Sequence, residues 1–406
     1  LNGLDTPYVK VAREAVLATE GEIANGATLF GDGRRTTIAG ACLANSALFH
    51  GRAQEDTCGA AHFGTILVPM LTAMIEVQQH PLDRLIPALV AGYEAGGLLE
   101  QAFAGKTTPG GFRSTATYGS IAAAAAASRL MGLDAATTAA ALANAVSFSG
   151  GVLQSFADGT DEWRYQPGIA GRNGLTAAAL ARAGSVSAPQ AIEGKAGFVK
   201  AFAGVDVPAD LAASLGRDWA TLRVTFKPYP VCAFNQTPVT GALKLREELK
   251  GETPSAVRVR MNPYETGYAG MDAVGPFNSI SGTLMSIPFC IATTLIHGVP
   301  DMKRMTTYDD DTVESLVHRT TLIGDPAVPQ LCAVIEADTA NGTKVHEQRM
   351  TPADYAYDRA TVSQMLRRIG GEQAVPPTAF SRIEAFADRL PQGAIADAIS
   401  SFAINA

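Results

Sequence analysis

Residues 120–131 read SIAAAAAASRLM, and this run contains neither proline nor glycine. Alanine has the highest helix propensity, and its small side chain lets the axes of packed helices approach closely. Four further segments are predicted to be helices and are separated by Gly, Pro, Asp or Ser: 64–79, 82–103, 134–146 and 174–183. The Ala-rich run therefore belongs to a large all-helical domain.

The pattern changes near Thr221. Residues 222–230 (LRVTFKPYP) and 256–261 (AVRVRM) alternate apolar and polar side chains, which predicts half-buried strands. The Asn341-Gly342 pair, within residues 331–350, is a strong turn signal between two strand-like segments. The middle of the chain is therefore expected to contain a sheet with a hairpin.

The last part of the chain returns to a helical pattern, at residues 378–405, and a helix is also predicted between the strands, at 281–297. The expected fold class is mainly α, with a large all-helical domain and a smaller α+β lid domain inserted before the C-terminal helix. The helical domain is assigned to residues 1–221 and 378–406, and the lid domain to residues 222–377.

Composition excludes several classes of protein. The chain has 406 residues, a net charge of −7 and no Lys/Arg run, which argues against nucleic-acid binding and against an anionic membrane surface. No stretch approaches the roughly 18 consecutive apolar residues of a membrane span. Five cysteines without CxxC spacing are typical of reduced thiols in a cytoplasmic protein.

The stretch HGRAQEDTCGAAH (residues 50–62) concentrates side chains that carry chemistry. His50, Asp56, Cys58 and His62 are all possible metal ligands, but their spacing fits no strong zinc pattern. A solvated loop and an acid/base loop are the alternatives. The second is favoured because a predicted helix follows, and helix N-termini bind anions.

A second candidate stretch is PGGFRSTATYGS (109–120), in which Arg113 would suit a carboxylate, although a surface arginine beside a capped loop is the alternative. A third is DGTDEWRYQPG (158–168), a loop that is either solvated or the wall of a ligand site formed by Trp163 and Arg164.

A fourth stretch is FKPYPVCAFNQTP (226–238), at the predicted domain junction. Lys227 could clamp an anion or, if desolvated, act as a base. Cys232 could be a nucleophile or base, or simply a buried apolar residue. No GxGxxG, P-loop, GxSxG or HExxH motif is present, which argues for cofactor-free chemistry on a small anionic substrate.

In this order, the four stretches resemble the MmgE/PrpD family, which includes 2-methylcitrate dehydratase, cis-aconitate decarboxylase and iminodisuccinate epimerase. The family patterns ANGxxxHxLDFDDTH…HP, GFHPTGT, DGTxTKxLHxGxAA and KxYPxC correspond to ANSALFHGRAQEDTCGAAHFG, GFRSTAT, DGTDEWRYQPGIAG and KPYPVC. The segments 193–204 and 282–298 are also similar to family segments. The resemblance implies a helical domain with an α+β lid, a small polycarboxylate substrate and an oligomer, usually a homodimer.

The chain departs from the family pattern at several proton-transferring positions. Ala53 replaces the first Asp of LDFDDT, and Arg113 replaces the His of GFHPTGT. Trp163 and Gln166 replace the Lys and His of TKxLH. Four positions keep the family pattern: Asp56, Thr57, His62 and Lys227. Cys232 stands where some members carry a His.

These departures favour an epimerase that inverts a carbon next to a carboxylate, with iminodisuccinate as the candidate substrate and with no metal or organic cofactor. His62 is the expected acid/base group, and its partner is Lys227, Cys232, Cys58 or Asp56. The expected substrate-binding residues are Arg113, Arg164, Trp163, Gln166, Thr57 and Cys58. Two alternatives stay open: a hydro-lyase of the 2-methylcitrate dehydratase type, and a non-catalytic protein that binds a polycarboxylate.

Overall fold

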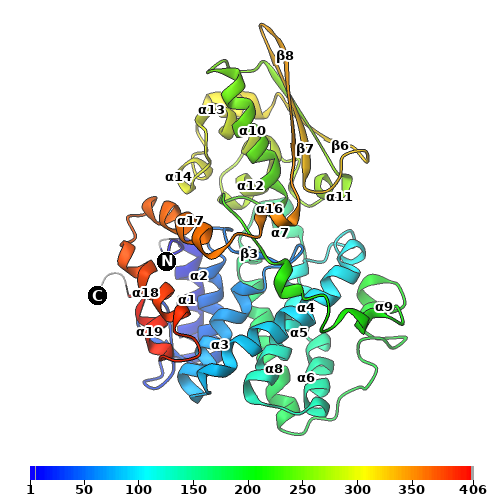
Figure 1. The fold of residues 1–406 in the computed structure, drawn as a ribbon, viewed down its shortest axis with the longest axis vertical. Helices are drawn as coiled ribbons and strands as arrows, with labels where there is room; N and C mark the ends of the chain where they lie inside the picture. Colours follow the sequence, from blue (N-terminus) through cyan, green and yellow to red (C-terminus); the bar gives the residue numbers. More distant parts are fainter. Residues whose placement is uncertain (5, 404–406) are drawn as a thin grey trace. The chain divides into compact units, whose positions relative to one another are not determined.

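A computed structural model describes residues 1–4 and 6–403 of the chain, and the chain is mainly helical with a smaller α+β part, as expected (Figure 1). It forms two compact units. Unit 1 comprises Leu1–Val152, Glu162–Val224 and Asp358–Ala406, and unit 2 comprises Leu153–Asp161 and Thr225–Tyr357.

The centre of unit 1 is the Ala-rich helix α5 (Ser114–Met131), which packs between α4 (Leu85–Thr107) and α8 (Gln166–Arg182) (Figure 1). Almost every residue of α5 is buried. A Cβ atom on Gly174 of α8 would lie 2.3 Å from Cβ of Ala123, so only glycine allows these two helices to approach so closely.

Helix starts in unit 1 lie earlier than the composition indicated in two cases. The helices predicted from 120 and 174 begin at Ser114 and Gln166, because the preceding residues are compatible with a helix although they lack the alanine signature. Asp134 caps α6 as predicted, accepting a hydrogen bond from the backbone N–H of Thr137 at 2.8 Å.

The other unit 1 elements are α1 (Pro7–Glu20), β1 (Ala27–Thr28), β2 (Arg35–Thr36), α2 (Ile38–Phe49), β3 (Asp56–Thr57), α3 (Gly64–Gln78), η1 (Leu82–Arg84), α6 (Ala135–Ser147), η2 (Glu162–Arg164), α9 (Phe198–Ala203), η3 (Leu211–Ser214), η4 (Ala220–Arg223), α17 (Arg359–Gly371), α18 (Pro377–Asp388) and α19 (Ile395–Ser400).

Unit 2 is built on a four-stranded sheet with the strand order β6-β5-β7-β8. β5 (Ala256–Met261) is the predicted strand, and β7 (Cys332–Thr339) and β8 (Gly342–Arg349) form the predicted hairpin, in which Thr339 pairs with Gly342. Helix α10 (Gln236–Leu249) packs against β7 and β8 (Figure 1).

Two segments of unit 2 differ from the prediction. Only Thr225–Phe226 (β4) of the expected strand 222–230 is extended in a strand. Residues 222 and 223 belong to η4, and Pro228 and Pro230 beyond the strand have no N–H to donate. The helix expected over 281–297 is two helices, α12 (Ile280–Met285) and α13 (Ile287–His297), with Ser286 as the N-cap of the second. The other unit 2 elements are α7 (Gln154–Asp158), η5 (Ala233–Asn235), α11 (Pro263–Thr266), α14 (Met302–Met305), α15 (Asp311–Val317), β6 (Thr320–Gly324) and α16 (Pro352–Tyr355).

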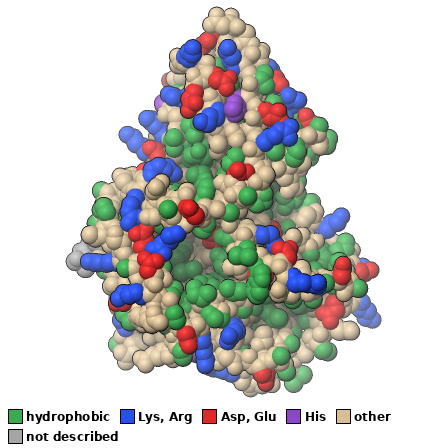
Figure 2. All heavy atoms as spheres, viewed as in Figure 1, with side chains coloured by type: hydrophobic (Ala, Val, Ile, Leu, Met, Phe, Trp, Pro, Cys, Tyr) green, Lys and Arg blue, Asp and Glu red, His purple; other side chains and the backbone are tan. Residues whose placement is uncertain are grey.

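Charged side chains of both signs are interspersed on the face of the molecule drawn in Figure 2. On the sheet, for example, Arg258 pairs with Glu336 and Asp338 at 2.9 and 2.7 Å. Within the described chain, every helix is too short or too polar to cross a bilayer.

Candidate functional site

The loop of residues 50–63 connects α2 to α3 and contains four acid/base side chains: His50, Glu55, Asp56 and His62. His50 caps the C-terminal end of α2, and α3 begins at Gly64. The loop is compact because Ala53 and Gly59 adopt positive φ angles of 53° and 61°, and because Cys58 and Ala61 pair as an isolated β-bridge. This path turns the side chains of Glu55 and His62 toward His50.

His62 is held by its backbone and by its ring. Its backbone N–H donates to Oγ1 of Thr115 at 3.2 Å, which ties the loop to the first turn of α5. Its ring nitrogen Nδ1 lies 2.9 Å from the carbonyl oxygen of Asp56 and 3.3 Å from Oε1 of Glu55. His62 therefore has a fixed ring orientation beside a carboxylate.

Glu55 also contacts the second histidine of the loop. Its Oε1 lies 3.2 Å from Nδ1 of His50, so one carboxylate oxygen serves two imidazoles whose ring centroids are 5.3 Å apart. The Glu55 side chain is only 6% exposed and His50 is fully buried, so solvent screens these charges weakly.

Arg113 completes the group from the residue before α5. Its Nη2 lies 2.6 Å from Nε2 of His50, and its Nη1 donates to the carbonyl oxygen of Trp163 and, at 3.2 Å, to Oε1 of Gln166. Arg113 is 2% exposed. The donors described here face protein acceptors, so the guanidinium joins the loop of residues 50–63 to the segment that precedes α8.

That segment contributes a layer of stacked side chains. The Trp163 ring meets His50 edge-on at 4.7 Å, and the guanidinium of Arg164 lies 4.0 Å from the Trp163 ring and 3.9 Å from the Tyr8 ring. Tyr8 in turn donates to the carbonyl oxygen of Gly51. Cations over aromatic faces are stabilised by the ring quadrupole, which holds Arg164 inside unit 1.

Two of the residues predicted for the site point elsewhere. Oδ2 of Asp56 accepts a hydrogen bond from Tyr93 at 2.5 Å, and its other oxygen lies against the first residue of α3, where a carboxylate stabilises the helix N-terminus. Cys58 packs in the hydrophobic core, and burial raises the pKa of its thiol to about 12. Asp56 thus supports α3, and the Cys58 thiol is protonated at neutral pH.

The structure places three further residues that were predicted for the site: Thr57, Lys227 and Cys232. Thr57 is buried in β3. Lys227 and Cys232 belong to unit 2. Lys227 is buried, and the backbone N–H of Cys232 donates to the carbonyl oxygen of Leu284 at 3.0 Å. Their part in the site stays a prediction.

Sequence reasoning assigned no catalytic or binding role to Glu55, and it weighed His50 only as a metal ligand. The available signal was an acidic residue midway between two histidines in one loop. No group of three His, Cys, Asp or Glu side chains among residues 1–4 and 6–403 is arranged to hold a metal ion.

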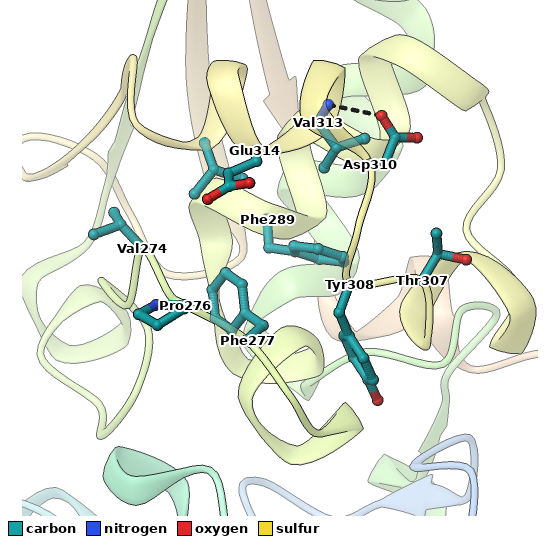
Figure 3. Close-up of a pocket in the computed structure, with 10 residues that line it drawn as sticks. Val274, Pro276, Phe277, Phe289, Thr307, Tyr308, Asp310, Val313 and Glu314 are labelled. Atoms are coloured by element: carbon teal, nitrogen blue, oxygen red, sulfur yellow. Dashed lines mark hydrogen bonds between the residues drawn. The ribbon is translucent and has the colours of Figure 1, made fainter.

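Unit 2 contains a separate cavity of about 50 Å³. Figure 3 shows the rings of Phe277 and Phe289 at its centre, with Asp310 at its edge bonded to the backbone of Val313. Asp310 is committed to capping α15 and to His297, which lies 2.7 Å away. This cavity has an apolar centre and does not contain an acid/base group like that of unit 1.

The buried side chain of Glu100, on α4, supports the loop of residues 50–63. Oε1 of Glu100 accepts a hydrogen bond from the backbone N–H of Ala60 at 2.7 Å, and a Cβ atom on Gly59 would collide with the same carboxyl group. Burial raises the pKa of Glu100 from 4.5 to about 7. Below about pH 7, the folded protein therefore holds Glu100 mainly in its neutral form.

Glu100→Gln is expected to change how stability depends on pH. Because the folded-state pKa is above the unfolded-state value, Glu100 contributes most below about pH 4.5, and its contribution is lost as pH rises to about 7. Glutamine keeps the acceptor for Ala60 without titrating. The variant should therefore gain up to about 3 kcal/mol relative to wild type between these pH values, measured by urea unfolding. Parallel pH profiles for the two proteins would contradict the assignment.

Comparisons with known proteins place these features in context. Residues 1–209 match the sequence profile of the MmgE/PrpD N-terminal domain, and residues 229–360 match that of the MmgE/PrpD C-terminal domain. The two matches together cover most of the chain.

Several curated relatives share this similarity. The cis-aconitate decarboxylase-like protein oryM of Aspergillus oryzae is 28% identical over 355 residues, which cover 80% of this chain and 72% of that protein. A cis-aconitate decarboxylase of Aspergillus terreus is 26% identical over 70% of this chain and 62% of its own length. The human cis-aconitate decarboxylase is 29% identical over 52% of this chain and 45% of its own length.

Proposed function

The chain belongs to the MmgE/PrpD family, and on this premise we propose that it is a cofactor-independent enzyme that moves a proton at a carbon next to a carboxylate of a small polycarboxylate. The observation that carries the proposal is His62 beside Glu55, in a buried group that also contains His50 and Arg113. The substrate class is suggested by the relatives named for cis-aconitate.

In the proposed reaction, His62 is the general base. The C–H bond breaks, the proton goes to the imidazole, and the electron pair is delocalised into the adjacent carboxylate as an enolate-like intermediate. Cationic groups stabilise such an intermediate, and the sequence predicts Arg113, Arg164 and Lys227 for this role. An imidazole with a carboxylate partner is well suited to proton transfer near neutral pH.

The finer proposal is epimerisation. Return of a proton to the opposite face inverts the carbon. The sequence predicts Lys227, Cys232, Cys58 or Asp56 as its donor, and Asp56 and Cys58 point elsewhere in the structure. The family pattern has His where this chain has Arg113, and Lys and His where it has Trp163 and Gln166. Loss of these proton-transferring groups favours a reaction that only breaks a C–H bond and re-forms it on the opposite face. Iminodisuccinate, with four carboxylates, is the proposed substrate.

Incubation with iminodisuccinate in D₂O is expected to exchange the hydrogen on the carbon that carries nitrogen. Proton NMR should show loss of that C–H signal and interconversion of stereoisomers, with the carbon skeleton intact. Heat-denatured enzyme is the control. Absence of both exchange and interconversion would remove the epimerase proposal.

A lyase reaction is the second candidate, because the curated relatives are named as decarboxylases. The same base could serve it, and the same experiment distinguishes it. Release of CO₂ from cis-aconitate, or a new conjugated double bond from 2-methylcitrate or citrate, would replace the epimerase assignment if its turnover exceeded that of exchange with iminodisuccinate.

A further inference from the structure

Glu55 and His50 form a chain of contacts between Arg113 and His62, and we propose that these two residues position His62 and raise its affinity for a proton. The inference rests on the proposed function, because it assigns roles around the base of that reaction. It concerns residues that lie together within unit 1.

The backbone determines which ring nitrogen of His62 is the base. Nδ1 lies 2.9 Å from the carbonyl oxygen of Asp56, and a carbonyl oxygen can only accept a hydrogen bond. In the neutral ring, Nδ1 therefore carries the hydrogen and Nε2 carries the lone pair. The tautomer that presents Nε2 as a base is thus set before any side chain acts on the ring.

Glu55 stabilises the protonated form of this ring. Its Oε1 lies 3.3 Å from Nδ1 of His62, on the side of the imidazole away from Nε2. When Nε2 takes a proton, the positive charge that spreads over the ring lies beside a carboxylate that is 6% exposed. An opposite charge at this distance favours the charged form, and weak solvent screening strengthens the effect.

His50 holds Glu55 in place and is not a second base. Its Nε2 faces Nη2 of Arg113 at 2.6 Å, and a guanidinium has donors but no acceptor. The lone pair of His50 is therefore at Nε2, and its hydrogen is at Nδ1, 3.2 Å from Oε1 of Glu55. A proton on Nε2 would oppose the guanidinium, so this contact favours the tautomer with the hydrogen on Nδ1, the nitrogen that faces Glu55.

Arg113 anchors the end of this chain of contacts that lies away from His62. Trp163 and Gln166 accept hydrogen bonds from its Nη1, and the Trp163 ring packs edge-on against His50. Other charged or titratable groups near these contacts include Tyr8, Asp56, Tyr93 and Arg164. Asp56 is bonded to Tyr93, and Arg164 is stacked on aromatic rings, whereas Glu55 faces both imidazoles.

Titration of the six histidines by NMR tests this inference without any substrate. The intact protein is labelled with ¹⁵N-histidine, and the His62 signal is assigned with His62→Gln. In Glu55→Gln, His62 is expected to titrate at lower pH than in wild type, and Glu55→Asp should restore much of the difference. Glu76→Gln, which removes a carboxylate bonded to Thr28, should leave the His62 titration unchanged.

Kinetics supply the second readout. Glu55→Gln is expected to lower kcat for proton exchange about 10- to 100-fold with little change in KM, because the backbone still fixes the tautomer and only the charge stabilisation is lost. The acid limb of the pH–rate profile should move with the His62 titration. Folding of each variant is checked by circular dichroism.

The two proposals fail in different ways. If wild type exchanges no proton in any polycarboxylate, the proposed function is wrong, while the His62 titration still measures the effect of Glu55. If His62 titrates alike in wild type and Glu55→Gln, the inference is overturned even in an active enzyme.

Discussion

His62→Gln is expected to lower the rate of α-proton exchange about 10²- to 10⁴-fold, the range typical of a lost general base. Glutamine approximates the reach of histidine and can donate to the Asp56 carbonyl, but it cannot accept a proton at neutral pH. Because the base acts in the transition state, kcat should fall far more than KM changes. The measurement is loss of the substrate C–H signal in D₂O under saturating substrate.

His80→Gln is the matched control for this prediction. His80 lies beyond the C-terminal end of α3 and contacts Gln78 at 2.9 Å, away from the group around Glu55. The control should retain wild-type exchange. A His62→Gln protein that also kept wild-type exchange, with normal folding, would exclude His62 as the base and would require another group in its place.

The helices were the most predictable part of the fold, because their signal is local. The Ala-rich run of α5 and the N-cap Asp134 are both visible in the sequence and both confirmed. β6 (Thr320–Gly324) was not predicted. It pairs in parallel with β5, some 60 residues earlier, and its five residues give no clear alternation, so its partner and not its own sequence defines it.

The site was predictable as a set of segments but not as a set of contacts. His62 and Arg113 were singled out, and the structure brings both to His50, although that histidine was expected at most to bind a metal. Glu55 was overlooked because its neighbour Asp56 matched the family pattern. The fold separates these adjacent carboxylates: Asp56 turns to Tyr93, whereas Glu55 turns to the histidines.

The physical reason for this separation lies in the backbone of the loop of residues 50–63. Ala53 takes a left-handed conformation, which residues other than glycine rarely adopt. An alanine at this position does not predict such a conformation. Gly59 does the same over the buried carboxyl group of Glu100. A loop whose path depends on a distant helix cannot be derived from its own residues, so the direction of each side chain required the structure.

Arg113→Met is expected to lower the free energy of unfolding by about 3 kcal/mol or more. Methionine has a similar length and no donors, so Nε2 of His50, the carbonyl oxygen of Trp163 and Oε1 of Gln166 all lose a donor. Each buried acceptor left without a partner costs about 1–3 kcal/mol. Urea unfolding followed by circular dichroism at pH 7 measures the loss.

Arg182→Met is the matched control, because Arg182 occupies the exposed last turn of α8 and its replacement should change stability by no more than about 0.5 kcal/mol. Arg113→Lys should fall between the two, since an ammonium keeps the charge but cannot reach acceptors on three sides in the plane of a guanidinium. If Arg113→Met were as stable as the control, the three acceptors would not depend on the guanidinium. Arg113 would then be available to the substrate, and its contact with His50 would not fix the orientation of that ring.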